Sequence, residues 1–430
     1  MADNLYQRIK DYILKLPLIT WFFLGFLITY LFFFIGPVFF DPSRNMQFIQ
    51  YIPVLSPIGA DFRFIVAASS TWIHSGKLVS INYPAFTLVF FVPFTFLSYG
   101  AGYKIMTMII LICFVLITLM LPLWIYKQKN ISAVAMLVFI TGMISYGLQF
   151  ELERGQENVI AFMFCLTAIH LYHNYPKSRW LAYLFLSISV QLKLYPAIFV
   201  FALIENWSDW KNNIKRFIGL GVLNMAALFI FGLGPMLETF GQFGRAQATQ
   251  DGRPDNLSIR SFANYILSLN PLPHQGIFLW LEANDWVFQF LLLVFFVICF
   301  VIILWQAYKR SSKGFDPYVF MACLVGAMII PPISFDYKLS ILPASIVLFI
   351  PAIESFKEGG NRSLIILLAF VFSLAYSSTL YSYRIKPELI RNDLPALLVL
   401  LTICTILSCI RSDAMGNAVS GNLRGNSDDH

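Results

Sequence analysis

The run Leu16–Phe40, LPLITWFFLGFLITYLFFFIGPVFF, contains no charged side chain. A transmembrane helix needs about 20 consecutive apolar residues to cross roughly 30 Å of hydrocarbon, so this run is long enough to span a bilayer. It is too long for the core of a signal peptide and lacks a small-residue cleavage site, so we expect it to be retained. The run therefore predicts a first transmembrane helix.

The whole chain continues in the same way. Of its 430 residues, 58% are hydrophobic and 12% are charged, whereas a soluble domain carries about 25% charged residues. We therefore expect an all-α polytopic membrane protein with about 12 transmembrane segments, forming one domain over residues 1–411. Residues 412–430, rich in Asn, Gly, Ser and Asp, are predicted to be a disordered tail. The expected spans are residues 18–40, 103–126, 131–149, 157–173, 178–191, 195–206, 214–237, 285–307, 317–332, 338–354, 362–380 and 393–411.

The basic residues predict the orientation of these spans. Lys10 and Lys15 precede the first span and place the N-terminus in the cytoplasm. The basic loop at residues 126–129 stays on the same side only if residues 86–97 do not form a full span. We therefore interpret residues 86–97 as a juxtamembrane or re-entrant helix that is broken at Pro93.

A second interruption follows from the same rule. Residues 181–204 contain Lys193 and Pro196 inside an apolar stretch. Broken helices occur where the backbone lines a cavity, so we expect two short segments that meet at an outer turn.

This orientation places five polar clusters on the outer face, where they suggest one active site. The cluster at residues 151–158 is expected to be a loop at the mouth of two spans. The clusters are Asp61 with Arg63, Glu151–Asn158, Gln191–Pro196, Asn256–Ser261 and Ser334–Lys338.

The first cluster lies in Pro57–Pro84, PIGADFRFIVAASSTWIHSGKLVSINYP, which predicts a short amphipathic juxtamembrane helix. Asp61 would lie near the start of that helix, where the helix dipole favours an anion. It could simply cap the helix, but Arg63 and the other clusters on that face indicate a working carboxylate. The residues at helical spacing are Phe62, Ile65, Val66 and Ser69.

The remaining clusters each allow two interpretations. Gln156 and Asn158 are expected in the first turn of a helix, where they could cap it or bind a ligand. Lys193 either faces a cavity or a counter-charge or extends to the membrane interface. Asp336 and Lys338 could form a salt bridge, but Lys338 could equally hold a phosphate.

Several function classes are excluded by what the sequence lacks. The six cysteines lie inside apolar runs without a CxxC pair or a nearby histidine, so we expect neither disulfides nor a metal. There is no Walker loop and no DxD with a soluble nucleotide-binding domain, which argues against an ATP-driven pump and a nucleotide-sugar enzyme. The net charge of +7 collects in short loops and does not suggest nucleic acid. We expect no cofactor.

The order of these motifs resembles glycosyltransferase family 87, over roughly residues 16–355. The chain departs from the family's frequent Ser-Trp-Asp-His-Tyr pattern, which here reads Ser-Phe-Asp-Tyr-Lys over residues 334–338, and it has Tyr-Pro-Ala in place of Tyr-Pro-Pro. The matching motifs are Asp61 in the first outer loop, Tyr83-Pro84, Gly155-Gln156-Glu157-Asn158, Leu192-Lys193-Leu194-Tyr195-Pro196 and Asn256-Leu257-Ser258.

The resemblance implies a C-type membrane glycosyltransferase that uses a polyprenyl-phosphate sugar, typically mannose, and inverts the linkage. Asp61 would be the general base. The acceptor would be linked to a lipid or a glycan, on the extracytoplasmic face of a bacterial inner membrane. The departing phosphate needs positive charge, for which the candidates are Lys193, Lys338, Arg260 and Arg63. The candidate substrate-binding residues are Tyr83, Glu153, Arg154, Gln156, Asn158, Asn256, Ser258, Asp336 and Tyr337.

Two other functions remain as alternatives. A lipid-linked-sugar flippase or secondary transporter predicts internal repeats and charges near the middle of the bilayer. The sequence shows no convincing repeat, and its polar clusters lie at the outer ends of the spans. An oligosaccharide polymerase or ligase would be expected to carry several arginines in two large outer loops, whereas the outer loops here are modest.

Overall fold

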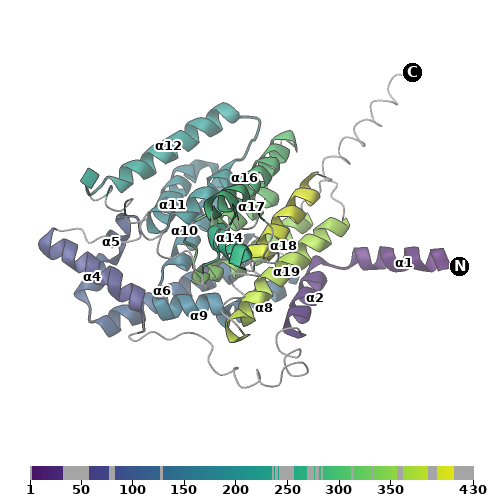
Figure 1. Cartoon of the computed structure of the whole chain (residues 1–430), viewed down its shortest axis with the longest axis horizontal. Coiled ribbons are helices and arrows are strands. Elements are labelled where there is room, and N and C mark those ends of the chain that lie inside the picture. Colours follow the sequence, from purple (N-terminus) through teal and green to yellow (C-terminus); the bar gives the residue numbers. More distant parts are fainter. Residues whose placement is uncertain are drawn as a thin grey trace.

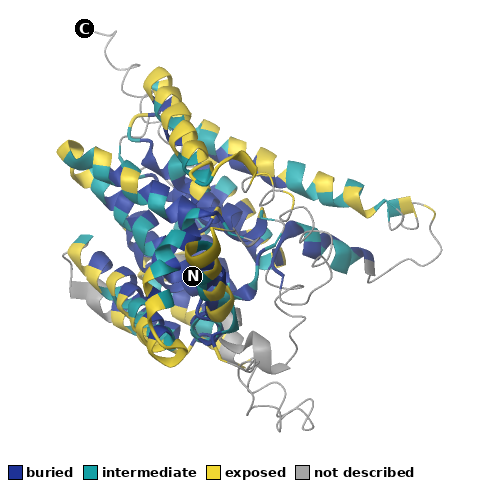
Figure 2. Cartoon of the chain, turned by 90° about the vertical axis from the view of Figure 1, so that its left-hand side faces the viewer, coloured by how far each residue is buried: buried dark blue, intermediate teal, exposed yellow. Residues whose placement is uncertain are grey.

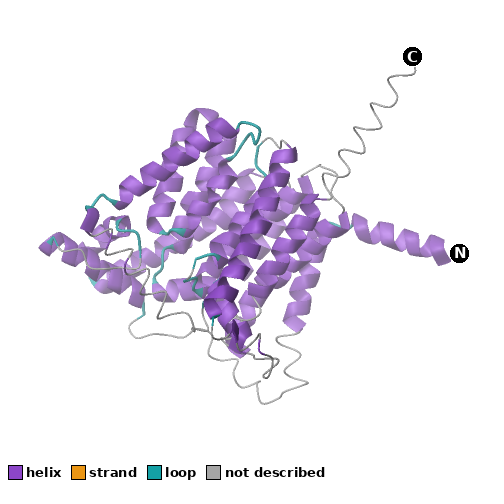
Figure 3. Cartoon of the chain, turned by 45° about the horizontal axis from the view of Figure 1, so that its top comes forward, coloured by secondary structure: helices purple, strands orange, loops and turns teal. Residues whose placement is uncertain are grey.

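The computed structural model describes residues 2–31, 58–76, 83–125, 129–234, 237, 241, 256–268, 276, 280–281, 284–310, 314–331, 333–355, 362–385 and 395–410. Within these ranges the regular structure is helical, apart from one isolated antiparallel bridge between Asn256 and Phe335 (Figure 3). The all-α prediction is confirmed. The predicted tail at residues 412–430 and the end of the first predicted span lie outside the described residues.

The helices follow the predicted spans closely for much of the chain (Figure 1). In order they are α1 (Ala2–Lys15), α2 (Leu18–Tyr30), α4 (Ala60–Ser75), α5 (Phe86–Phe91), α6 (Tyr99–Val115), α7 (Leu121–Ile125), α8 (Lys129–Met143), α9 (Tyr146–Arg154), α10 (Asn158–Asn174), α11 (Arg179–Leu192), α12 (Trp210–Leu228), α14 (Ile259–Ser268), α16 (Asp285–Arg310), α17 (Pro317–Ile329), α18 (Leu342–Ser355) and α19 (Arg362–Ile385). Short 3-10 segments are η3 (Val92–Phe96), η5 (Pro176–Ser178), η6 (Tyr195–Leu203) and η7 (Asp336–Ile341), and η4 (Leu116–Met120) is a π-helical turn. A last helix covers Pro395–Ile410.

Some of these helices are long and apolar enough to cross a membrane. Among the described residues there are three, or four if one bent pair counts as a single span. They are Tyr99–Ile125, Asp285–Arg310 and Asp336–Glu354, with the pair Val134–Met143 and Tyr146–Arg154 as the fourth. Shorter apolar helices accompany them, and the count of about 12 spans stays a prediction.

Away from the polar clusters, the interior of the protein is built from apolar helices. Every residue of α17 is buried, as expected for a helix that is hydrophobic all round. The Asp316 side chain begins this helix by accepting from the Tyr318 and Val319 amides, and Arg310 holds the Asp316 carboxylate at 2.7 Å. By contrast, α12 and α16 carry many exposed apolar residues, and Figure 2 shows exposed residues spaced along the outer helices. Such exposed apolar residues are suited to lipid contact.

Both predicted interruptions are confirmed. Helix α5 ends at Phe91 and continues as the 3-10 segment η3, which contains Pro93. Helix α11 ends at Leu192, Lys193 has an extended backbone, and η6 begins beside Pro196.

The predicted span at residues 131–149 is bent, and the loop predicted at residues 151–158 is helical up to Arg154. The chain does not run straight through residues 131–149, because α8 and α9 meet at a 50° bend. Ser145 starts α9 by accepting a hydrogen bond from the Leu148 amide at 3.4 Å. Glu151, Glu153 and Arg154 consequently belong to a helix rather than to a plain loop.

The predicted amphipathic helix around Asp61 is present as α4, and it is fastened to the end of α9. The Gly59 amide, at the start of α4, donates to the Glu153 carbonyl at 2.6 Å. From α6, the Tyr103 hydroxyl donates to the Leu152 carbonyl at 2.7 Å. These bonds place the first turn of α4 beside the turn between α9 and α10.

That turn needs a glycine. Gly155 ends α9 with φ +67°, a conformation that favours glycine, and a methyl group there would lie 2.7 Å from the Phe62 Cβ. Phe62 is next to Asp61 in α4 and is buried among aromatic rings. Gly155 thus sets how closely α4 approaches α10.

We expect Gly155→Ala to lower the stability of the protein more than Gly76→Ala does. Gly76 ends α4 with an almost identical φ of +66°, but no atom of the described residues lies within 4 Å of an added methyl. Both variants should carry a left-handed backbone cost of about 1–2 kcal/mol, and only Gly155→Ala should add about 1–3 kcal/mol of overpacking. Thermal unfolding of the detergent-purified proteins measures the difference, and equal midpoints would contradict it.

Candidate active site

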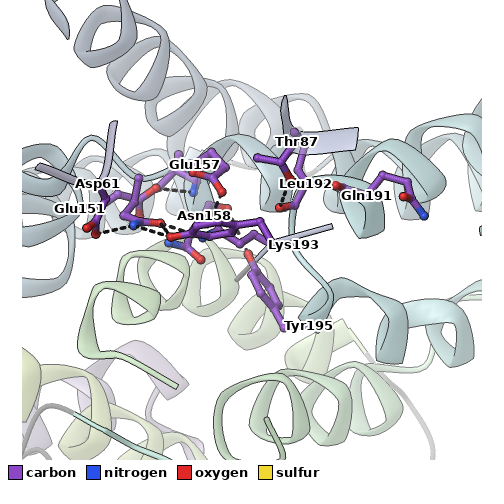
Figure 4. Close-up of polar contacts among 12 residues, drawn as sticks. Asp61, Thr87, Glu151, Glu157, Asn158, Gln191, Leu192, Lys193 and Tyr195 are labelled. Carbon is purple, nitrogen blue, oxygen red and sulfur yellow. Dashed lines mark hydrogen bonds and ion pairs between the residues drawn. The ribbon is translucent and has the colours of Figure 1, made fainter. Parts of the chain in front are cut away.

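The side chain of Gln156 connects three of the predicted site residues, of which Asp61 and Lys193 are labelled in Figure 4. Its Nε2 donates to Asp61 Oδ2 at 2.6 Å and to the Tyr83 hydroxyl at 2.9 Å. Its Oε1 accepts from Lys193 Nζ at 2.7 Å. Segments that are far apart in the sequence therefore meet at one amide group.

Tyr83 forms one wall of this cluster. Its ring centroid lies 4.0 Å from Lys193 Nζ, and the ring of Tyr337 lies 5.7 Å from the same ammonium group. Burial, together with the nearby carboxylates of Glu157 and Asp61, raises the pKa of the Tyr83 phenol. Tyr83 therefore keeps its proton at neutral pH and remains a hydrogen-bond donor.

Lys193 has a buried counter-charge. Its Nζ lies 3.0 Å from Glu157 Oε1, and the two side chains are 9% and 0% exposed. The extension of Lys193 to the membrane interface, one of the two sequence interpretations, is therefore wrong. Glu157 is a member of the cluster that sequence reasoning did not select, although it stands between Gln156 and Asn158.

Glu151 is a second residue that sequence reasoning did not select. Its Oε1 accepts from the Val159 amide at 2.7 Å, and its Oε2 accepts from the Ser340 hydroxyl. This carboxylate joins α9 to the first turn of α10 and to η7. The only sequence signal was an acidic residue in the polar segment at residues 151–158.

Helix α10 begins at this cluster without a cap from its own N-cap residue, although Glu151 of α9 accepts from its Val159 amide. Its N-cap residue, Glu157, makes no capping hydrogen bond, and Gln156 is occupied by Asp61, Tyr83 and Lys193. Asn158 is fully buried, and its Nδ2 and Oδ1 have no hydrogen-bond partner among the described residues. Neither amide therefore plays the capping role that the sequence allowed.

The salt bridge considered between Asp336 and Lys338 does not form. Asp336 accepts a hydrogen bond from the Tyr146 hydroxyl. Lys338 Nζ lies 5.4 Å from the centroid of the Tyr195 ring and pairs with no carboxylate in the part of the chain that the structure describes. Lys338 is 7% exposed and lies close enough to Lys193 for the two charges to repel each other.

Two further basic candidates, Arg63 and Arg154, have different surroundings. Arg63 is exposed on α4, whereas Arg154 pairs with Glu153 at 3.2 Å. Arg154 also lies over the Phe150 ring at 4.9 Å. The Arg154 guanidinium group is therefore already bound by Glu153 and Phe150 of its own helix.

The Asn-Leu-Ser motif holds the backbone of its loop. Asn256 Oδ1 accepts from the amides of Ser258 and Ser334, at 3.1 and 3.0 Å. Ser258 Oγ accepts from the Ser261 amide at 3.1 Å, beside the start of α14, and Arg260 lies half-buried in the first turn of that helix. The motif thus attaches α14 to the segment that leads into η7.

We expect Lys193→Met to destabilise the protein by about 3–5 kcal/mol, because it leaves the Glu157 carboxylate buried without a cation. The double variant Lys193→Met/Glu157→Gln should recover most of this loss, since neither charge is then buried. Chemical or thermal unfolding of the purified variants measures both effects, with the exposed Lys215→Met as a control. A double variant no more stable than Lys193→Met would contradict the pairing.

The comparison with protein families agrees with the motifs. The model of glycosyltransferase family 87 matches residues 82–335, which is more than half of the chain. No curated protein and no solved structure matches the chain. The chain therefore belongs to glycosyltransferase family 87 and is a membrane glycosyltransferase.

Proposed function

We propose that the protein transfers a hexose, with mannose as the first candidate, from a polyprenyl-phosphate sugar to a lipid- or glycan-linked acceptor. Asp61 acts as the general base. The reaction takes place at the extracytoplasmic face of a bacterial inner membrane, the side to which the basic loops direct the polar clusters.

The position of Asp61 carries this proposal. Its Oδ2 is held by Gln156 at 2.6 Å, while its Oδ1 has no partner among the described residues. One oxygen thus fixes the orientation of the carboxylate, and the other is left to accept a proton. Asp61 is half-buried at the edge of the cluster, where an acceptor can approach from outside.

The chemistry of the transfer fits this arrangement. As the acceptor oxygen attacks the anomeric carbon, its proton passes to Asp61. The bond between the anomeric carbon and the phosphate oxygen breaks, and its electron pair leaves with polyprenyl phosphate. The attack occurs opposite the leaving group, so the new linkage is inverted relative to that of the donor.

The leaving phosphate explains why lysines lie beside a carboxylate base. Negative charge grows on the phosphate oxygen during the reaction, and a fixed cation in a site shielded from water stabilises it strongly. Lys193 and Lys338 are buried close to each other and are the candidates for this cation. Asp61 and Lys193 contact opposite atoms of the Gln156 amide, so the base and the lysines belong to one small cluster.

We expect Asp61→Asn to reduce sugar transfer by about 10²- to 10⁴-fold, because asparagine cannot accept the proton. Purified protein in nanodiscs is given radiolabelled polyprenyl-phosphate mannose, and then the glucose and arabinose analogues, with a membrane lipid extract as acceptor. Asp11→Asn, on the exposed face of α1, serves as the matched control and should retain activity.

Two results would count against the proposal. Equal transfer by wild type and Asp61→Asn would remove Asp61 from the mechanism. Absence of transfer from all three donors, with wild type correctly folded by size-exclusion chromatography, would reject this donor class.

A further inference from the structure

Lys338 differs from the other buried cations of the protein. Lys193 is paired with Glu157, and Arg310 is paired with Asp316 at 2.7 Å. Lys338 is buried to a similar degree, yet no carboxylate contacts it among the described residues. Its ammonium group lies over the face of the Tyr195 ring.

An ammonium group in this position is unfavourable in the unliganded protein. Burial removes water from the charge, and Lys193 adds repulsion. The Tyr195 ring offers only a weak partial compensation. An anion that enters the cluster would relieve both the desolvation and the repulsion.

Asn158, which contacts the same Tyr195 side chain, provides an independent indication that a ligand binds near Lys338. Its amide nitrogen and oxygen are both buried and unpaired in the described part of the chain, although buried amides in folded proteins are ordinarily hydrogen-bonded. Its own backbone carbonyl accepts from the Tyr195 hydroxyl at 3.0 Å. Tyr195 therefore contacts Asn158 through its hydroxyl, as Figure 4 shows, and Lys338 through the face of its ring.

Lys193 is less available for a ligand. Its ammonium already contacts the Glu157 carboxylate and the Gln156 carbonyl oxygen, and it stacks on Tyr83. Its charge is balanced within the protein, and its hydrogen bond to Gln156 holds the amide that orients Asp61.

We propose that Lys338 binds a phosphoryl oxygen of the polyprenyl-phosphate donor, with Asn158 donating a hydrogen bond to the same group, and that Lys193 is a positioning residue. This inference rests on the proposed function. When the bond to the sugar breaks, the monoester phosphate gains a second negative charge, and among the described residues Lys338 is the buried lysine whose charge no carboxylate balances. The family often has an uncharged tyrosine at this position of its Ser-Trp-Asp-His-Tyr pattern, so the assignment concerns this chain in particular.

Ligand binding without turnover tests the assignment. Wild type, Lys338→Met and Lys338→Arg are purified in detergent, with Lys215→Met as a surface control. Each is titrated with polyprenyl phosphate and with the uncharged polyprenol of the same chain length. Wild type, Lys338→Arg and Lys215→Met should prefer the phosphate, and Lys338→Met should lose at least about tenfold of that preference.

Thermal unfolding without ligand separates a binding role from a structural one. Removal of an unpaired buried charge should leave the midpoint of Lys338→Met at or above that of wild type. A lower midpoint, or failure to fold, would show that Lys338 is a structural lysine and would overturn the proposal.

The role of Lys193 is tested in the variant Lys193→Met/Glu157→Gln, in which no unpaired charge is buried. It should keep the preference for phosphate over alcohol but lose sugar transfer, because Gln156 Oε1 then loses its 2.7 Å bond to the ammonium group and keeps only the 3.3 Å bond from the Tyr83 hydroxyl. Loss of the phosphate preference in this variant would instead make Lys193 the phosphate ligand and would overturn the assignment.

The remaining outcomes distinguish this inference from the function on which it rests. If wild type binds the phosphate no better than polyprenol, the proposed donor class is wrong. If wild type and Lys338→Met prefer the phosphate equally, the donor class stands and the role of Lys338 is wrong. A raised KM for the acceptor alone in Lys338→Met would place the bound anion on the acceptor and would also overturn the assignment.

Discussion

The arrangement of the site depends on the orientation of one amide group. Gln156 donates to Asp61 through Nε2 and accepts from Lys193 through Oε1. A flipped amide would turn its NH₂ toward the ammonium group and its oxygen toward the carboxylate, so electrostatics allows only one orientation. Lys193 is fixed in turn by Glu157. The contacts run from the Asp61 carboxylate through the Gln156 amide and the Lys193 ammonium group to the Glu157 carboxylate. Negative and positive groups alternate along this series, so groups of like charge do not touch within it.

The surrounding helices position these polar groups and shield them from water. The cluster is assembled where helices end: at the start of α4, at the turn between α9 and α10, at the end of α11 and in η7. Helix ends carry the polar residues, and the apolar bodies of α10, α17 and α18 exclude water from the inner side. In such a medium each charge interaction is stronger than it would be at the surface. Thr87 adds rigidity, since its hydroxyl donates to the last carbonyls of α11 at 3.1 and 3.2 Å.

Much of this architecture could be predicted because apolar run length and basic loops report directly on membrane helices. The interruptions at Pro93 and Lys193 were visible for the same reason. The bend between α8 and α9 was not, because the capping bond of Ser145 lies inside a stretch that is long and apolar enough for one straight span. Hydropathy measures the surface to be buried, and it does not register a local hydrogen bond that redirects a helix.

Individual side chains were harder to assign than segments. The sequence located the polar segments that meet around Gln156, but it could not show which members face inward. Glu157 was passed over as a site residue and proved to be the counter-charge of Lys193. Asn256 and Ser258 were expected to bind substrate, whereas their side chains hold backbone amides. The side chains of an Asn-x-Ser pattern can hold the backbone of a loop or bind a ligand. Only the partners of their hydrogen bonds, seen in the structure, distinguish these two roles.

The limits of the family match have a consequence for comparing this enzyme with its relatives. Residues 82–335 contain Tyr83, Gln156, Glu157 and Lys193, but Asp61 precedes this range and Lys338 follows it. The shared region therefore supplies the internal frame of the site, while the proposed proton acceptor and phosphate ligand are contributed by flanking sequence. Alignments confined to the shared region would group enzymes by this frame. They would not detect a change at the positions of Asp61 or Lys338. Under the proposed roles, chimeras that exchange the two flanks would replace these reactive groups and leave the frame unaltered.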